Sequence, residues 1–281
     1  MTRNKSFNNG PLLYLVATPI GNLKEISNRA LEVFNDADII AAEDTRNTYS
    51  LLSNYGIKKE LFSLREHNEL EASKHLINLI KQGKKIVYVS DAGYPGISDP
   101  GYLLVQSAIK ENINVSVVSG SSAFLTALVA SGLSTEHFYF FGFLSKKGNE
   151  GKTSLEELKD REETLIFYES PHHIKKTLEV MLEVFGNRNA VIARELTKLN
   201  EEYIRGTLEE LNQIDEQTLK GEMVVLIEGK KKDSDELSDE LIIERLKYYL
   251  SYKIDKKTAI ELVKNELNIG KNRVYKLAMD L

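Results

Sequence analysis

The chain of 281 residues contains no cysteine, only five histidines and only five prolines. The absence of cysteine excludes disulfides, thiolate nucleophiles and cysteine-ligated metals, and it fits a reducing cytosol. Apart from the pair His172 and His173, the histidines show no close-spaced pattern of metal ligands, which argues against a metal enzyme. The first nine residues are polar and lack the apolar stretch of a secretory signal, so we expect a cytoplasmic protein.

Residues 112–135 carry no charge, and a stretch of this length raises the question of a membrane span. The stretch contains Gly120, Gly132 and several serines, and its centre has the pattern of a strand that turns into a small-residue helix. We therefore predict that it does not cross a membrane. The net charge of −5 argues against a generally basic nucleic-acid binder, although a local basic patch stays open.

Short apolar runs, each ending in a loop of small and polar residues, organise the first half of the chain. The runs cover residues 12–17, 38–42, 86–89 and 115–118, and helical patterns occur at residues 27–34, at residues 69–81 and after residue 122. Strand, loop and helix in repetition are typical of a mainly parallel sheet. The content of 42% hydrophobic and 28% charged residues is that of an ordinary globular protein, and the length suggests two domains.

From about His137 the apolar runs become longer and more aromatic, which marks a second α/β domain. Predicted strands cover residues 138–143, 164–168, 190–195, 203–206 and 223–228, and predicted helices cover residues 154–161 and 172–185. The third and fourth of these strands are close enough in the chain to form a hairpin. We therefore predict a mixed sheet in this half rather than a purely parallel one.

The end of the chain has a different composition. Residues 230–238 lack apolar periodicity and are predicted to be a linker, and helical stretches follow at residues 241–250, 256–267 and 270–279. Their short spacing resembles a helix-turn-helix module. Residues 250–281 hold seven basic and four acidic residues, so a nucleic-acid contact and a capping bundle with a solvated basic face both stay open. The predicted domains are α/β domains at 11–118 and 119–230 and a helical module at 236–281.

Four of the five prolines lie just after predicted strands: Pro19, Pro95, Pro100 and Pro171. Residues 90–101 form the densest of these loops, with three glycines, two prolines and two aspartates. This loop alone fits a braced double turn as well as a ligand site. Rigid loops gathered at the carboxyl ends of strands favour the ligand site. The complete P-loop and dinucleotide-binding patterns are absent.

Five segments, taken in order, resemble motifs of the ribosomal RNA small subunit methyltransferase I group of tetrapyrrole methylases. The segments are residues 13–23, 42–46, 90–101, 168–172 and 194–198. The resemblance covers residues 11–229 and implies a homodimer with a cofactor cleft between two α/β domains. It further implies transfer of a methyl group from S-adenosyl-L-methionine to the ribose 2′-hydroxyl of a cytidine in small-subunit (16S) rRNA.

The resemblance also implies which residues contact the cofactor. By position they are Pro19, Ala92, Gly93, Tyr94, Ile97, Ser122, Ala123, Glu169 and Leu196. Several of these depart from the tetrapyrrole enzymes: Tyr94 stands where their Gly-Gly-Asp tripeptide has its aspartate, Glu169 replaces a methionine and Leu196 a glycine. Backbone contacts are therefore safer to carry over than side-chain contacts. Asp91 or Asp99 either supplies the missing carboxylate or braces its turn.

Charged groups at strand ends supply the candidate catalytic residues Asp44, Arg46, Glu195 and Lys198. We expect Asp44 or Glu195 to act as a base and Lys198 to lower the pKa of the acceptor hydroxyl. Arg46 or Arg194 is expected to hold a phosphate, although an arginine beside a glutamate is also common as an interface ion pair. Methyl transfer is a direct displacement, so alignment in a dry cleft matters more than a base.

Other polar groups have structural interpretations that are at least as good. His67 precedes a helix and His172 begins one, so both are expected to cap helices rather than to contact substrate. The lysine pairs at 146–147 and 175–176 are expected to be solvated faces, with an RNA-facing rim as the alternative. Two other functions stay open: a tetrapyrrole methylase acting on a small macrocycle, and a non-catalytic RNA-binding protein. The basic tail and the Ala-Glu-Asp-Thr-Arg motif favour an RNA substrate over a macrocycle.

Overall fold

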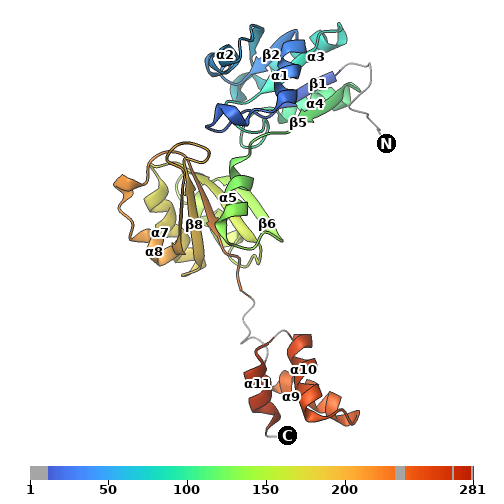
Figure 1. The fold of residues 1–281 in the computed structure, drawn as a ribbon, viewed down its shortest axis with the longest axis vertical. Coiled ribbons are helices and arrows are strands. Elements are labelled where there is room, and N and C mark those ends of the chain that lie inside the picture. The colour runs from blue at the N-terminus through green and yellow to red at the C-terminus, as the bar shows by residue number, and fades with distance from the viewer. Residues whose placement is uncertain (1–11, 232–237, 268, 280) are drawn as a thin grey trace. The chain divides into compact units, whose positions relative to one another are not determined.

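The computed structural model describes residues 12–231, 238–267, 269–279 and 281. The chain forms two compact units, one ending at Gly229 and the other beginning at Lys230 (Figure 1). The predicted domain limits at residues 11 and 236, and most of the predicted linker, lie outside the described residues. The division of the first unit between residues 118 and 119 stays a prediction.

The first unit begins with a parallel sheet whose strands follow the order β3-β2-β4-β1-β5. The strands are β1 (Leu12–Val16), β2 (Ile39–Ala42), β3 (Glu60–Ser63), β4 (Ile86–Val89) and β5 (Asn114–Val118). The helices are α1 (Asn28–Asp36), α2 (Thr45–Asn54), α3 (Glu69–Lys81) and α4 (Tyr102–Lys110), with short 3₁₀ helices η1 (Leu23–Glu25) and η2 (Glu66–Asn68). The predicted parallel sheet is confirmed, while α2, β3 and α4 were not predicted.

Helices cover both faces of this sheet. Apolar residues of α3 and α4, among them Leu76 and Leu104, pack on one face, and Phe34 of α1 and Leu52 of α2 pack on the other. Every residue of β4 is buried as a result, which explains its unbroken apolar sequence. The loops of the predicted site follow the carboxyl ends of these strands.

The second sheet of this unit is mixed, as predicted, with the order β6-β7-β10-β8-β9. Its strands are β6 (Phe138–Phe143), β7 (Thr164–Glu169), β8 (Asn189–Arg194), β9 (Glu202–Thr207) and β10 (Met223–Ile227). Its helices are α5 (Ala123–Ser131), α6 (Glu150–Glu157), α7 (Ile174–Phe185), α8 (Leu208–Asn212) and η3 (Glu216–Thr218). β6 pairs with β7 in parallel, the other pairs are antiparallel, and β8 and β9 form the predicted hairpin.

The two faces of the second sheet are covered by different helices. α6, α7 and α8 pack on one face, for example Leu178 near Phe167, and α5 packs on the other, with Leu128 near Ile166 (Figure 1). α6 begins and ends four residues earlier than the helix predicted at 154–161. α8 was not predicted.

The second unit consists of α9 (Asp239–Ser251), α10 (Lys256–Leu267) and α11 (Lys271–Ala278), close to the predicted helices. Their apolar stripes enclose a small core of their own, which includes Leu246, Ile260 and Val274. Among the described helices of both units, none combines the length and the hydropathy needed to cross a membrane.

Candidate functional site

The loop after β4 is joined to the loop after β1 by two backbone hydrogen bonds. The Thr18 N–H donates to the Gly93 carbonyl (2.9 Å), and the Gly93 N–H donates to the Thr18 carbonyl (3.1 Å). Gly93 has φ 73°, a left-handed conformation that glycine adopts at little cost. The Tyr94 hydroxyl accepts a hydrogen bond from the Gly120 N–H (3.2 Å), which adds the loop after β5. Three strand ends are thus held together mainly through backbone groups.

The other end of the 90–101 loop is braced by buried groups. The Glu69 carboxylate accepts hydrogen bonds from the N–H groups of Gly101 and Leu103, both at 2.8 Å. The Tyr88 hydroxyl donates to the Pro100 carbonyl (2.8 Å). Gly101 has φ 131°, and a Cβ there would lie 2.7 Å from the Tyr88 ring. The loop is therefore braced at this end by buried groups of the protein itself.

A cavity of about 660 Å³ lies against this loop. Its lining comes from the loops after β1, β2, β4, β5, β7 and β8, from the end of β6 and from the start of β10. Ligands of α/β proteins bind outside the carboxyl ends of parallel strands, which is where this cavity lies. Eight of the nine predicted cofactor residues line it: Ala92, Gly93, Tyr94, Ile97, Ser122, Ala123, Glu169 and Leu196. Pro19 is not among the lining residues, but its neighbour Ile20 is.

The lining of this cavity is acidic. It contains no lysine or arginine and five carboxylates, from Glu43, Asp91, Asp99, Glu169 and Glu222. Burial and the nearby Glu43 raise the pKa of Asp99 to about 6, although a hydrogen bond with Ser90 lowers it. Burial also raises the pKa of Glu43. A cavity with this charge favours a cation over an anion.

The segment after β7 presents one satisfied and one unsatisfied polar group. Glu169 is buried, and its carboxylate accepts hydrogen bonds from the Ser170 N–H (2.7 Å) and the Thr177 hydroxyl (2.6 Å). The Ser170 Oγ is also buried but has no hydrogen-bond partner in the part of the chain that the structure describes. Because Ser170 lines the cavity, its hydroxyl is a group that a bound ligand can satisfy.

Asp44 caps the N-terminus of α2 and is held by Arg46. The Arg46 N–H (2.9 Å), Nε (3.0 Å) and Nη2 (2.5 Å) all donate to its carboxylate. These bonds hold the pKa of Asp44 well below its usual range. Asp91 accepts hydrogen bonds from the Asp44 N–H (3.1 Å) and the Asn47 amide (2.8 Å), which connects this cluster to the cavity wall. Asp44 and Arg46 do not line the cavity, whereas Glu43 does.

Lys198 forms two ion pairs at the end of β8. Its Nζ donates to Glu195 Oε1 (2.9 Å) and to Glu222 Oε2 (3.2 Å). Burial alone would lower the pKa of Lys198, but the hydrogen bonds to the two glutamates outweigh it and raise this pKa. The bond to Lys198 lowers the pKa of Glu195. Because Glu222 lines the cavity, a single ion pair connects the Lys198 ammonium to the cavity wall.

The turn that carries Lys198 is strained and closely packed. Glu195 (φ 50°) and Thr197 (φ 66°) both have left-handed backbone conformations, which are uncommon for residues other than glycine. A Cβ at Gly221 would collide with the Glu195 carboxylate, and a Cβ at Gly21 would lie 2.6 Å from Lys198 Cγ. Glycines from two separate loops therefore leave the space in which the Glu195 and Lys198 side chains are held.

Comparisons with known proteins agree with this geometry. Residues 12–212 match the family of Tetrapyrrole (Corrin/Porphyrin) Methylases. The chain is 46% identical to the Ribosomal RNA small subunit methyltransferase I of Halalkalibacterium halodurans, over 94% of this chain and 93% of that protein. It is 41% identical to the protein of the same name from Bacillus subtilis, over 98% and 97%. The chain belongs to the tetrapyrrole methylase family, in the ribosomal RNA small subunit methyltransferase I group.

Solved structures of similar methylases confirm the two-sheet fold. The methyltransferase CobJ gives a TM-score of 0.60 at 18% identity, covering 79% of this chain and 95% of its own. The uroporphyrin-III-C-methyltransferase of Thermus thermophilus gives 0.56 at 20% identity, covering 78% and 94%. The helical unit from Lys230 onward lies beyond the part of this tetrapyrrole methylase that the family match covers.

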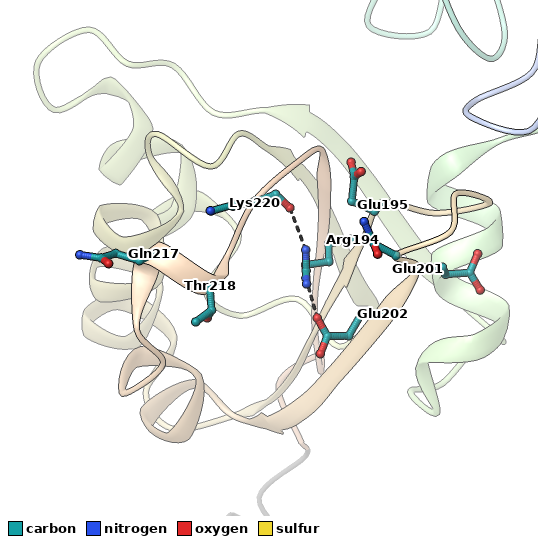
Figure 2. A pocket seen from close by; sticks show the side chains of 8 residues that line it. Arg194, Glu195, Glu201, Glu202, Gln217, Thr218 and Lys220 are labelled. Atoms are coloured by element: carbon teal, nitrogen blue, oxygen red, sulfur yellow. Dashed lines mark hydrogen bonds and ion pairs between the residues drawn. The ribbon is translucent and has the colours of Figure 1, made fainter.

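A second hollow of this tetrapyrrole methylase, about 510 Å³ in volume, lies beside the Glu195 turn. Figure 2 shows that Arg194 is engaged there: its guanidinium donates to Glu202 (2.6 Å) and to the Lys220 carbonyl (3.1 Å). Arg194 therefore forms an ion pair with a glutamate, which was the alternative to its holding a phosphate. Glu195 lines this hollow and not the acidic cavity.

Aromatic lining residues were missed by the sequence reasoning. Phe124, Phe143 and Tyr168 line the cavity, and the Phe143 and Tyr168 rings are 5.4 Å apart. Tyr168 belongs to one of the recognised motifs, which was the available signal. Residues 222–224 were also missed, because they reach the cavity only through the antiparallel direction of β10, and the sequence pattern of a strand does not reveal its direction.

Several other expectations need correction. His172 does not cap α7: His173 occupies the N-cap position, without a side-chain hydrogen bond. The Lys175 ammonium is not simply solvated, since it donates to the Asn212 carbonyl. His67 does not cap a helix either: it lies within the short helix η2 before α3, and the capping bond is made by its neighbour Asn68, whose side chain accepts a hydrogen bond from the Arg65 N–H (2.7 Å).

Gly151, Lys152 and Thr153 match the last three positions of a P-loop at the start of α6. Lys146 stands where that pattern requires its first glycine. The Lys152 ammonium forms an ion pair with Glu183 (2.5 Å). This segment is therefore used in packing α6 against α7.

Proposed function

We propose that this chain transfers a methyl group from S-adenosyl-L-methionine to the ribose 2′-hydroxyl of a cytidine in small-subunit (16S) rRNA. The observation that carries the proposal is the acidic cavity beside the 90–101 loop. It gathers eight expected cofactor positions in a chain whose near-full-length relatives are named as methyltransferases of small-subunit rRNA. The expected location is the cytoplasm, where ribosomal subunits are found.

The cavity suits this cofactor on its own terms. S-adenosyl-L-methionine, when bound, supplies a methyl group on a positively charged sulfur. The acidic lining attracts such a cation, and the lysines nearby are paired with lining carboxylates: Lys146 lies 4.0 Å from Glu169, and Lys198 donates to Glu222. The backbone at Ala92 and the orphaned Ser170 hydroxyl would hold polar parts of the molecule. The volume lies within the range of roughly 300–1,000 Å³ that is usual for small-molecule sites.

Arg46 and Lys198 are the positive groups best placed to act on the RNA. The Arg46 side chain is 84% exposed, which suits contact with a phosphate. Lys198 is charged at neutral pH, so it would stabilise the acceptor oxygen as that oxygen loses its proton. The ribose oxygen gains the methyl group as the carbon–sulfur bond breaks, and the hydroxyl proton passes to a carboxylate or to water.

The roles of Asp44 and Glu195 follow from their partners. Each carboxylate has a lowered pKa because a basic side chain is hydrogen-bonded to it, and a carboxylate with a lowered pKa takes up a proton less readily. We therefore favour positioning roles: Asp44 fixes Arg46, and Glu195 fixes Lys198. The alternative is that one of these carboxylates acts as a general base; Asp44→Asn, below, tests whether Asp44 is required at all.

The proposal as a whole is tested by deleting the gene and mapping ribose methylation across the small-subunit rRNA. We expect a single 2′-O-methyl mark at a cytidine to disappear and to return when the gene is restored. An unchanged map would contradict the proposed substrate. Calorimetry with S-adenosyl-L-methionine separates the enzyme from a non-catalytic RNA-binding protein, since the latter would show no cofactor binding.

The site is tested by Asp44→Asn, which keeps the shape of the helix cap but loses the charge that holds Arg46. We expect methylation of small subunits to be abolished while the affinity for S-adenosyl-L-methionine stays nearly intact. Asp215→Asn is a matched control, because Asp215 also caps a helix and accepts a backbone hydrogen bond (3.0 Å) away from the cavity. Full activity of Asp44→Asn would remove Asp44 from the mechanism.

We also propose that the protein works as a homodimer. α5 is apolar around nearly its whole surface, and Val129, which is not among the lining residues of the acidic cavity, is 78% exposed. A helix of this kind is normally covered, and a second copy is the occupant that the family resemblance implies. Val129→Glu is expected to yield monomers by light scattering coupled to size-exclusion chromatography. Wild-type protein that elutes as a monomer would refute the dimer.

A further inference from the structure

Two tyrosines at the end of α9 form an exposed aromatic pair. Tyr248 and Tyr252 are 46% and 66% exposed, and their ring centroids are 5.1 Å apart. The neighbouring Tyr249 is different, because it packs on the core of the helical unit and its hydroxyl donates to Glu266 (2.9 Å). The Arg245 guanidinium lies 4.9 Å from the centroid of the Tyr248 ring, so the open ring surface of the pair is that of Tyr252 and the part of Tyr248 that Arg245 leaves uncovered.

Four lysines lie close to the two tyrosines in the sequence. Lys247, Lys253, Lys256 and Lys257 are all exposed, and none of them has an ion-pair partner within the described part of the helical unit. Other basic side chains of the unit are paired, among them Arg245 with Glu266 and Arg273 with Asp239. We refer to Lys247, Tyr248, Tyr252, Lys253, Lys256 and Lys257 as the tyrosine–lysine corner.

The corner contains little negative charge to offset its lysines. Asp255 is the one acidic residue between positions 247 and 257. Its carboxylate accepts hydrogen bonds from the Thr258 N–H (3.0 Å) and the Thr258 hydroxyl (2.6 Å) at the start of α10. The surface that the corner presents is therefore aromatic and positively charged.

We propose that the tyrosine–lysine corner binds a single-stranded segment of RNA. This inference rests on the proposed function, which makes RNA the substrate. Unpaired bases can stack on exposed aromatic rings, and the unpaired lysines can contact the phosphates between them. A duplex offers its phosphates but keeps its bases stacked inside, so it can use the lysines and not the rings. The combination therefore selects for single strands.

The rings are tested in the full-length protein with a short fluorescein-labelled oligouridine and an RNA duplex of equal length, by fluorescence anisotropy. Replacing both tyrosines by alanine (Y248A/Y252A) is expected to weaken oligouridine binding roughly tenfold or more, since each stacked base contributes substantially. The matched variant Y248F/Y252F keeps the rings and is expected to bind within about twofold of wild type. Duplex affinity is expected to be nearly the same for all three proteins.

The lysines are tested through the salt dependence of oligouridine binding. Substituting Lys253, Lys256 and Lys257 by glutamine is expected to reduce the slope of log affinity against log salt concentration by about 2, since each phosphate contact to a single strand contributes about 0.7. The control replaces the exposed Lys58, Lys74 and Lys110 of the first unit by glutamine, which removes the same charge. The control is expected to leave the slope nearly unchanged.

Several results would overturn the inference. One is equal oligouridine binding by Y248A/Y252A and wild type, with circular dichroism showing both folded; another is an equal loss in Y248F/Y252F. Tighter binding of oligoglutamate than of oligouridine would assign the corner to an acidic protein partner instead. Methylation of small subunits by wild type is measured in parallel. If wild type methylates small subunits but its oligouridine binding does not depend on the corner, only this inference is refuted. If wild type does not methylate small subunits but its oligouridine binding depends on the two rings, only the proposed methyl transfer is refuted.

Discussion

Asp99→Asn is expected to stabilise the protein without ligand and to weaken binding of the methyl donor. Asp99 lies in the cavity wall, where burial and the neighbouring Glu43 disfavour its charged form. A carboxyl whose pKa is higher in the folded state than in the unfolded state costs stability whenever it is ionised. Asparagine has nearly the same shape and no charge, so it removes this cost.

The size of the effect follows from the pKa. A rise from 3.8 to about 6 corresponds to about 3 kcal/mol at a pH where the group is ionised in both states. Because the carboxyl is only partly buried, solvent screening reduces this to about 1–1.5 kcal/mol. For a unit of this size we expect a rise in Tm of roughly 3–5 °C. The gain should be full above about pH 7 and should shrink as the pH falls from about 6 toward 4.

Thermal unfolding of wild type and Asp99→Asn across this pH range measures the gain. Asp38→Asn serves as a control of opposite sign, because the Asp38 carboxylate accepts a hydrogen bond from the Lys85 N–H (2.8 Å), which lowers its pKa. That variant should be less stable than wild type near neutral pH, and the loss should fade as the pH falls through the lowered pKa. The reasoning would be refuted if Asp99→Asn gave no gain in stability at about pH 8, or if its gain at about pH 4.5 were as large as its gain at about pH 8.

The functional half of the prediction uses two ligands that differ in charge at sulfur. Calorimetry should show that Asp99→Asn weakens binding of S-adenosyl-L-methionine several-fold, because a negative charge near a cation is lost. S-adenosylhomocysteine has a neutral sulfur, so its affinity should change much less. Equal losses for both ligands would mean that Asp99 acts on some other part of the molecule.

Three further predictions concern the supports of the site. Lys198→Met keeps the apolar stem and removes the charge, so steady-state kinetics should show kcat falling roughly a hundredfold with little change in cofactor affinity; unchanged kcat would exclude Lys198 from the chemistry. Gly21→Ala places a methyl group 2.6 Å from Lys198 Cγ and should lower kcat in the same way; an unchanged kcat would show that the position of the lysine stem does not matter for the reaction. Glu69→Ala leaves the N–H groups of Gly101 and Leu103 without their acceptor and should cost about 2–3 kcal/mol in urea unfolding; an unchanged midpoint would show that water replaces the carboxylate.

Most elements of the fold were predictable because their apolar patterns are strong. α3 begins and ends where its amphipathic pattern predicted, and the hairpin of β8 and β9 followed from two apolar runs a short distance apart. α2 was missed because its sequence is mostly polar and lacks a strong apolar pattern. Its start is set by Asp44, which caps its N-terminus. α4 was missed because it follows directly on the loop of prolines and glycines, and it depends on Glu69 to satisfy its first N–H groups.

The cavity was predictable from motif order, whereas its chemistry was not. Eight predicted cofactor positions line one cavity because they follow strands that end at one edge or face it from the second sheet. The pKa values depend on partners that no motif specifies. Asp44 was a candidate base in sequence, but the Arg46 guanidinium that folds back onto it lowers its pKa. Glu222 lies outside the recognised motifs and joins Lys198 to the cavity only through the tertiary fold.

The pair of main-chain bonds between Thr18 and Gly93 has a consequence for how this family diversifies. Since the bonds involve no side chain, a neighbouring position such as Ala92 can be exchanged over evolutionary time without loss of these two bonds. A protein of this family can then keep the proposed methyl-donor site while substitutions around the cavity change which acceptor molecule binds. The same feature limits drug selectivity: a compound that contacts only the backbone of this wall would not distinguish relatives that share it, and discrimination would have to come from lining side chains such as Tyr94 and Phe143.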